Sequence, residues 1–147
     1  MKFRLAERAD VPALVALLSD DPLGVAREGS DLAPYLAAFD EIAANPMHQL
    51  LVAERAGRVI ATCQLTILPG LSRKGARRAL VEAVRVEADA RSSGVGAALM
   101  AEVEARALAA GASLVQLTTD HSRIRAHAFY DRLGYSPTHI GYKKQIG

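Results

Sequence analysis

The sequence contains few of the residues that build disulfide-rich, metal-binding or aromatic-rich proteins. Its single cysteine, Cys63, cannot form a disulfide within the chain, and tryptophan is absent. One cysteine and four scattered histidines lack the spacing of a zinc site, so we predict no metal. Aromatic residues make up only 5% of the chain, which favours a core of leucine, valine and isoleucine with small alanines between them.

Long apolar runs are also missing. No segment approaches the roughly 20 apolar residues that a membrane-spanning helix needs, and the first ten residues lack the apolar core of a secretory signal. We therefore expect a cytoplasmic protein with no membrane partner. Charge of one sign is not in excess either, since 18 basic and 16 acidic residues leave a net charge of +2. This near balance argues against nucleic acid as the partner.

The 147 residues, half of them hydrophobic, are enough for one core and too few for two ordinary domains. No repeat, linker or low-complexity tract divides the chain, so we predict a single domain over residues 1–147. The hydrophobic periodicity predicts the element order βααβββαβαβ, which is typical of an α/β or α+β layered fold. The expected elements are a strand at 3–7, a helix from an N-cap at Asp10 to about Leu18, a helix at 31–44, strands at 50–54 and 59–68 joined by a hairpin turn, a strand at 79–86, a helix at 94–110, a strand at 114–118, a helix at 123–133 and a closing strand at 136–145.

The segment Arg91 to Ala97, R-S-S-G-V-G-A, joins the end of a predicted strand to the start of a long amphipathic helix. A glycine-rich turn at this place leaves backbone N–H groups unpaired beside the positive end of the helix dipole. Gly94 and Gly96 let the backbone approach a ligand closely, and Arg91 adds a charge-assisted contact. The segment indicates a cradle for phosphate or pyrophosphate, although a plain helix-entry turn is an equally good interpretation.

Two familiar phosphate motifs do not match. A dinucleotide fingerprint requires a third glycine where this chain has Leu99, and a nucleotide P-loop requires Gly-Lys followed by Ser or Thr. The spacing of Arg91, Gly94 and Gly96 instead resembles the acyl-CoA motif of the GCN5-related N-acetyltransferase (GNAT) family, which is Arg or Gln, two residues, Gly, one residue, Gly or Ala. The preceding segment A-L-V-E-A-V-R-V is similar to the central strand of that family, and A-H-A-F-Y-D-R-L-G-Y, Ala126 to Tyr135, is similar to its later Ala-x-x-Phe-Tyr segment.

The resemblance implies a mixed, mainly antiparallel central sheet with helices on both faces, and direct transfer of an acetyl group from acetyl-CoA to an amine. It also implies that the backbone N–H groups of Val84 and Val86 bind the pantetheine arm, and that an N–H near Val84 binds the acyl oxygen. The residues expected at the pyrophosphate are Arg91, Ser92, Ser93, Gly94, Val95, Gly96 and Ala97.

Two side chains are candidates for proton transfer. Glu82 interrupts an apolar strand and, by simple alternation, shares a face with Leu80, Val84 and Val86. Burial there would raise the pKa of Glu82 above about 4.3, which suits a general base, whereas a salt-bridged carboxylate at the strand edge is the alternative. Tyr130 follows Phe129 as the acid tyrosine of the family does, so the resemblance implies that it protonates the leaving thiolate.

Each of these residues also has a purely structural interpretation. Tyr130 can be a half-buried packing aromatic, and Cys63, in register with Ala61 and Leu65, is expected in the core rather than as a nucleophile. The basic cluster of Arg73, Lys74, Arg77 and Arg78 is a solvated loop, or else a contact for an acidic acceptor, a second copy or nucleic acid.

The preferred function is an acetyl-CoA-dependent N-acetyltransferase that acts on an amine of a small molecule, peptide or protein. A non-catalytic acyl-CoA-binding sensor or subunit of the same fold is the alternative, and an acetyltransferase of nucleic acid is a third. A homodimer stays open. Acidic residues in the first half of the chain offer a lining that suits a cationic amine; they are Asp20, Asp21, Glu28, Asp31, Asp40 and Glu41.

Overall fold

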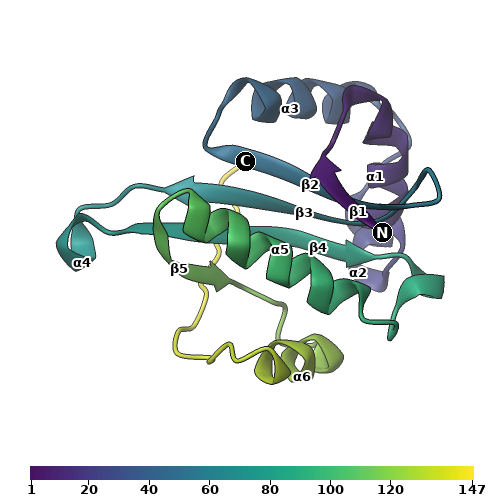
Figure 1. The fold of residues 1–147 in the computed structure, drawn as a ribbon. Helices are drawn as coiled ribbons and strands as arrows, with labels where there is room; N and C mark the ends of the chain where they lie inside the picture. Colours follow the sequence, from purple (N-terminus) through teal and green to yellow (C-terminus); the bar gives the residue numbers. More distant parts are fainter. The chain divides into compact units, whose positions relative to one another are not determined.

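A computed structural model describes residues 1–147 and resolves them into two compact units, Met1–Gln116 and Leu117–Gly147. The first unit is built around a five-stranded sheet with the strand order β1-β2-β3-β4-β5 (Figure 1). The strands are β1 (Lys2–Leu5), β2 (His48–Arg55), β3 (Arg58–Leu68), β4 (Arg77–Val86) and β5 (Ala112–Leu117). Pairing from β1 to β4 is antiparallel throughout.

The last strand breaks this antiparallel pattern, because β5 runs parallel to β4 (Figure 1). The arrows of β4 and β5 point the same way in Figure 1. Ser113 Oγ at the start of β5 lies 3.4 Å from the carbonyl oxygen of Arg77, at the start of β4. Because β5 has six residues and β4 has ten, the last residues of β4 extend beyond its end.

Helices cover both faces of the sheet, as expected for a mixed α+β fold. The helices are α1 (Val11–Ser19), α2 (Pro22–Arg27), α3 (Ala33–Ala44), the single turn α4 (Ser72–Gly75) and α5 (Val95–Ala109), with 3-10 turns η1 (Arg8–Asp10) and η2 (Ala88–Ala90). On one face, α1 and α3 lie over a cavity whose sheet lining includes Thr62 and Gln64. On the other face α5 packs on β3 and β4, and its Arg106 donates to Gln49 at 3.1 Å.

The core fills the space between α5 and the sheet. Val95, Leu99 and Val103 recur every four residues on α5 and are almost completely buried. Cys63 is 1% exposed among them, which confirms its expected place in the core. Burial raises the pKa of the Cys63 thiol to about 12, so it carries no nucleophilic thiolate near neutral pH.

Most predicted elements are confirmed, and two differ. The hairpin turn between β2 and β3 forms at Ala56 and Gly57, both with positive φ as a tight hairpin requires. The sequence predicts no helix between about Leu18 and residue 31, but α2 forms there because Asp21 caps it by accepting from the N–H of Gly24 at 2.6 Å.

The predicted closing strand at 136–145 is wrong. The second unit contains the helix α6 (Ile124–Arg132), and residues 135–147 form neither helix nor strand. Pro137 has no N–H to give to a ladder, and Gly141 has no side chain to pack on a sheet. The one backbone hydrogen bond from this segment to itself runs from the Thr138 N–H to the Ser136 carbonyl oxygen, so the segment turns locally instead of pairing.

A charged cluster joins β1, η1 and β2. Arg4 donates to both carboxylate oxygens of Asp10, at 2.7 and 3.0 Å, and its Nε donates to Glu54 at 2.7 Å. The Arg4 guanidinium holds the pKa of Asp10 below its usual 3.8, and the N–H of Glu7 adds to this effect. The ionised form of Asp10 is therefore bound more favourably in the folded chain than in the unfolded chain.

We predict that Asp10→Asn lowers the melting temperature at pH 7 and has little effect at about pH 2. Since the folded pKa of Asp10 is lowered, its contribution is present above the unfolded pKa and is lost as the pH falls through the folded pKa. Thermal unfolding followed by circular dichroism from pH 2 to 7 measures this. Asp40→Asn is the control, because the Arg8–Asp40 pair is exposed and contributes little. Equal destabilisation of Asp10→Asn at both ends of the pH range would contradict the assignment.

Candidate active site

A β-bulge in the middle of β4 shapes the site. Gln64 pairs with Glu82, while Thr62 pairs with Arg85, so Ala83 and Val84 together face the single residue Cys63. Ala83 has φ of 52°, a left-handed conformation that is unusual for a residue with a side chain. The bulge shifts the alternation of β4 by one residue.

This shift corrects the predicted neighbours of Glu82. Paired residues of a sheet present their side chains on the same face, so Glu82 shares its face with Leu80 and with Arg85, not with Val84 and Val86. Glu82 is also exposed, and the burial expected from the sequence is not found. No ion pair of Glu82 is present, so the alternative of a salt-bridged carboxylate is not supported either.

Within the first unit, no strand pairs with the outer edge of β4 beyond the bulge. The N–H of Glu87 donates to the Ile60 carbonyl oxygen at 2.8 Å, which turns the backbone of the preceding residue, Val86, away from β3. Accordingly the carbonyl oxygen of Val86 accepts from Arg91 Nε at 2.9 Å, and that of Val84 accepts from Arg85 Nη1 at 2.9 Å. By alternation the N–H groups of Val84 and Val86 point to the same open side, past the end of β5.

The glycine-rich segment lies between η2 and α5. Gly94 precedes the helix with φ of 85°, and a Cβ there would meet no atom, so its conformation rather than space requires glycine. The first α-helical hydrogen bond runs from the Ala98 N–H to the Gly94 carbonyl oxygen at 3.0 Å. The N–H groups of Val95, Gly96 and Ala97 are thus left without helical partners at the positive end of α5.

The side chains before the helix support this turn. Ser92 has φ of 61°, and the Ser93 hydroxyl donates to the carbonyl oxygen of Ala90. Arg91 and Val86 are linked by the bond described above, so the turn and the end of β4 are joined. Open amides of β4 and of the α5 N-terminus therefore belong to one continuous region of the first unit.

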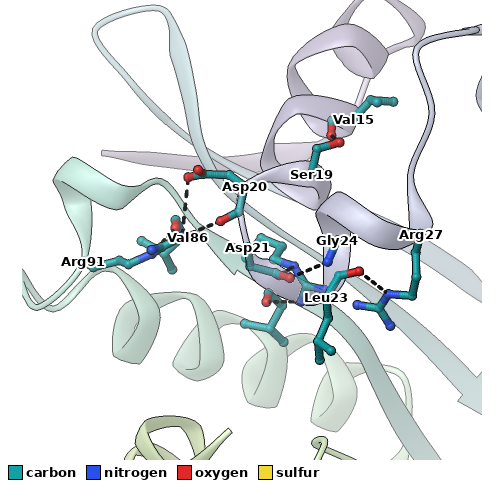
Figure 2. A network of polar contacts seen from close by, with 11 residues as sticks. Val15, Ser19, Asp20, Asp21, Leu23, Gly24, Arg27, Val86 and Arg91 are labelled. Carbon is teal, nitrogen blue, oxygen red and sulfur yellow. Dashed lines mark hydrogen bonds and ion pairs between the residues drawn. The ribbon is translucent and has the colours of Figure 1, made fainter.

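Two neighbouring aspartates join this region to the end of α1 (Figure 2). Asp20 accepts from Arg91 Nη2 through its backbone oxygen at 3.2 Å, and its carboxylate lies 3.5 Å from the same nitrogen. Asp21 lies 2.9 Å from Arg85 Nε. The Asp21–Arg85 pair is 11% and 15% exposed, whereas the Asp20–Arg91 pair is about half exposed, at 53% and 47%. The first pair is a structural link, and the second leaves Arg91 available to an anion.

A partly open, mainly apolar cavity of about 200 Å³ lies between α1, α3 and the sheet. Leu14 and Leu18 of α1, and Tyr35 and Phe39 of α3, line it. On the sheet side the lining includes Gln64 and reaches β4 at Ala83 of the bulge. The cavity therefore ends on the strand that carries the open amides.

Tyr130 lies on α6 in the second unit. Its ring packs edge-on against Phe129, with centroids 5.0 Å apart, and against Tyr135 at 5.9 Å. The Tyr135 N–H donates to the Tyr130 carbonyl oxygen at 3.0 Å, closing the end of α6. The ring is half-buried, as the packing interpretation expects.

Sequence reasoning missed Arg85, the two aspartates and the cavity. Alanine, not glycine, occupies the left-handed position of the bulge, so the sequence has no signal for the bulge. Simple alternation therefore does not predict that Arg85 shares a face with Glu82. The sequence marks Asp20 and Asp21 only as part of an acidic lining, and does not predict their arginine partners. Elsewhere, no group of three or more His, Cys, Asp or Glu side chains is arranged to hold a metal, and no helix is long and apolar enough to span a bilayer.

The strain at Ala83 generates a stability prediction. We expect Ala83→Gly to keep or raise stability by up to about 1 kcal/mol, because glycine adopts positive φ without a steric cost. Ala83→Val should lower it by about 1 kcal/mol or more, because a β-branched side chain is disfavoured in that conformation. Urea unfolding of both variants measures the difference. A valine variant as stable as the wild type would show that the bulge is not left-handed at this residue.

Comparison with known proteins agrees with this fold. A model described as the Acetyltransferase (GNAT) family matches residues 11–135. A transcriptional regulator from Bacillus halodurans C-125 has 35% sequence identity and a TM-score of 0.95, with 99% of each chain covered. No curated protein matches the chain at a significant level.

Two other solved structures share the fold at lower identity. Glucosamine-6-phosphate N-acetyltransferase from Arabidopsis thaliana is 21% identical with a TM-score of 0.83, covering 99% of this chain and 98% of that one. A predicted acetyltransferase from Clostridium acetobutylicum, solved with acetyl-CoA, is 18% identical with a TM-score of 0.77, covering 98% and 95%. Since the family model spans well over half of the sequence, the chain belongs to the GNAT acetyltransferase family.

Proposed function

We propose that the protein is an acetyl-CoA-dependent N-acetyltransferase that acts on a primary amine, and that residues 1–147 work as one catalytic domain in the cytoplasm. The observation that carries this proposal is the open edge of β4. The carbonyl oxygens of Val84 and Val86 are held by arginines, and the amides of α5 without helical partners follow directly. By strand alternation the N–H groups of Val84 and Val86 face the same side as these carbonyl oxygens. Such an edge can pair with an extended amide-bearing arm that ends in a pyrophosphate.

The same residues would hold acetyl-CoA. Val84 and Val86 would donate to the pantetheine amides, and the N–H groups of Val95, Gly96 and Ala97 would donate to the pyrophosphate. Arg91 would add a charge-assisted bond from its half-exposed position. Ser92 and Ser93 shape the turn, the latter through its hydroxyl bond to Ala90. When bound, acetyl-CoA supplies a thioester whose carbon–sulfur bond breaks as the amine nitrogen bonds to the acetyl carbon.

Glu82 is the proposed proton acceptor. A protonated amine has no lone pair for attack, so its proton must leave first. Glu82 stands directly before the bulge, is exposed and has no ion-pair partner. It can therefore take the proton directly or through a water molecule and pass it to solvent. A backbone N–H near Val84, beside the bulge, would donate to the acyl oxygen as negative charge develops there.

Tyr130 is the proposed proton donor to the sulfur. A tyrosine hydroxyl, with a reference pKa near 10, is protonated at neutral pH and can donate to a thiolate as it leaves. The nitrogen loses two protons in all. One leaves the ammonium through Glu82 to solvent, and the second leaves the nitrogen of the tetrahedral intermediate as the amide forms. This second proton, relayed through solvent, replaces the one that Tyr130 gives to the sulfur, so the reaction releases one proton overall. This role rests on the family motif in α6.

A non-catalytic acyl-CoA sensor is the second candidate. The observation that favours it is the name of the relative with 35% identity, a transcriptional regulator. Thiol release from acetyl-CoA in the presence of a panel of amines separates the two candidates. An enzyme releases thiol only when an amine is present, whereas a sensor gains thermal stability with acetyl-CoA and releases none.

The cofactor site predicts a charge effect. Gly96→Asp should abolish the rise in melting temperature that acetyl-CoA produces, because the new carboxylate lies beside the pyrophosphate amides. Aspartate in the first turn of a helix favours the helix dipole, so the variant should still fold. Gly96→Asn is the matched control of equal size, and should lose less affinity. Unchanged acetyl-CoA affinity in a folded Gly96→Asp protein would refute the site.

Glu82→Gln should lower kcat by roughly ten- to ten-thousand-fold while the affinity for acetyl-CoA changes little. The substitution preserves shape and removes basicity, so the acidic limb of the pH–rate profile should disappear as well. Glu87→Gln, a nearby carboxylate paired with Arg58, is the control. Full activity of Glu82→Gln with the same acidic limb would assign the proton to another base or to bulk water.

For Tyr130, the substitution to phenylalanine preserves the ring contacts with Phe129 and Tyr135 and removes only the hydroxyl group. We expect kcat to fall far more than acetyl-CoA affinity or melting temperature. Steady-state kinetics and thermal unfolding of Tyr130→Phe and Tyr130→Ala measure the two effects. A packing role predicts the reverse pattern, in which phenylalanine is silent and only alanine lowers stability.

A further inference from the structure

The six acidic residues that suggested a cationic acceptor are mostly engaged within the protein. Asp20 lies against Arg91, Asp21 against Arg85 and Asp40 against Arg8. The carboxylate of Glu28 accepts from the hydroxyl of Tyr35 at 2.9 Å. Asp31 accepts from the N–H of Ala33 at the start of α3. Of the six, Glu41 alone has no hydrogen bond or ion pair of its side chain. Three of the six carboxylates are therefore paired with arginines, and none of the six lines the cavity between α1 and α3.

The cavity between these helices is apolar instead. Two of its polar side chains use their hydroxyl groups internally: Thr62 donates to the Leu51 carbonyl oxygen at 2.7 Å, and Tyr35 donates to Glu28. Gln64 is the polar side chain of the lining with no hydrogen bond inside the protein. It is paired in register with Glu82 across β3 and β4. Polar groups thus meet the cavity at the bulge, and hydrocarbon surrounds the rest.

The helix that forms the outer wall is packed incompletely. Tyr35, Phe39 and Ile42 lie along one side of α3 and line the cavity, yet α3 has no buried residue. An amphipathic helix ordinarily buries its apolar side in the core, and α1 does so with four buried residues. An apolar ligand in the cavity would supply the contacts that α3 lacks. A dry cavity of about 150 Å³ is known to hold a benzene ring, so about 200 Å³ is enough for a phenyl or branched alkyl group.

We propose that the acceptor is a small primary amine with an apolar body, which lies in the cavity between α1 and α3 while its amino group lies at Gln64 and Glu82 beside the bulge. This inference rests on the proposed N-acetyltransferase function and adds the class of acceptor. Polyamines and aminoglycosides are disfavoured, because additional ammonium groups would lose hydration in the hydrocarbon lining without a carboxylate partner. Peptide amino termini are disfavoured, because the cavity has room for about one side chain and the rest of the peptide would have to lie outside it.

The test compares kcat/KM by thiol release from acetyl-CoA for four probes: 2-phenylethylamine, isoamylamine, spermidine and a tetrapeptide with a free amino terminus. We expect the first two to exceed the others by at least about tenfold. Ala38→Phe, which places a ring in the cavity lining, should lower kcat/KM for 2-phenylethylamine by about tenfold or more. Ala37→Phe, one residue away and outside the lining, is the matched control and should have little effect. Phe39→Ala enlarges the cavity and should shift preference towards larger amines.

Binding separates this proposal from the proposed chemistry. Calorimetry with 2-phenylethylamine in the presence of CoA reports the cavity without turnover. If the amine binds, and Ala38→Phe abolishes binding while Ala37→Phe does not, the cavity assignment holds even when no thiol is released, and the catalytic proposal fails alone. Turnover of spermidine or the tetrapeptide in preference to the apolar amines would overturn the acceptor class while the enzyme function stands. Absence of apolar amine binding would overturn it too.

Discussion

The bulge at Ala83 and Val84 is the constraint on which the site depends. One extra residue in β4 forces Ala83 into a left-handed conformation and moves every later side chain to the opposite face. Without it, Arg85 would leave the face of Glu82 and lose its position against Asp21. The same shift sets which backbone groups of β4 turn away from β3, and thereby which amides are open to a ligand.

Arginine side chains keep that open edge in place. Arg85 and Arg91 occupy the carbonyl oxygens of Val84 and Val86, so the edge offers its N–H groups without unsatisfied acceptors beside them. Asp20 and Asp21 at the end of α1 hold the other side of the same arginines. The neighbouring cavity has no carboxylate in its lining and reaches β4 at Ala83, so the bulge belongs to both the proposed cofactor region and the proposed acceptor site.

Much of the fold could be predicted from periodicity and turn residues. Leucine and valine at four-residue spacing located α5, and Gly57 located the hairpin, because these patterns are local. The bulge was not predictable, since a non-glycine residue in a left-handed conformation has no sequence signal and is stabilised by pairing with a distant strand. The closing strand failed for a related reason, because a strand needs a partner that its own sequence does not specify. The motif at Arg91 to Ala97 was local and was identified, whereas the ion pairs of Asp20 and Asp21 join positions about 65 to 70 residues apart and needed the fold.

The open edge of β4 can be tested most directly by amide hydrogen exchange at Val84 and Val86, measured by NMR with and without acetyl-CoA. The account predicts fast exchange at both amides in the free protein, although they lie in a strand, and marked protection when acetyl-CoA is added. Arg85 and Glu87, whose amides alternate towards β3, should be protected in both states. Protection of Val84 and Val86 in the free protein, or no change on adding acetyl-CoA that demonstrably binds, would contradict the account.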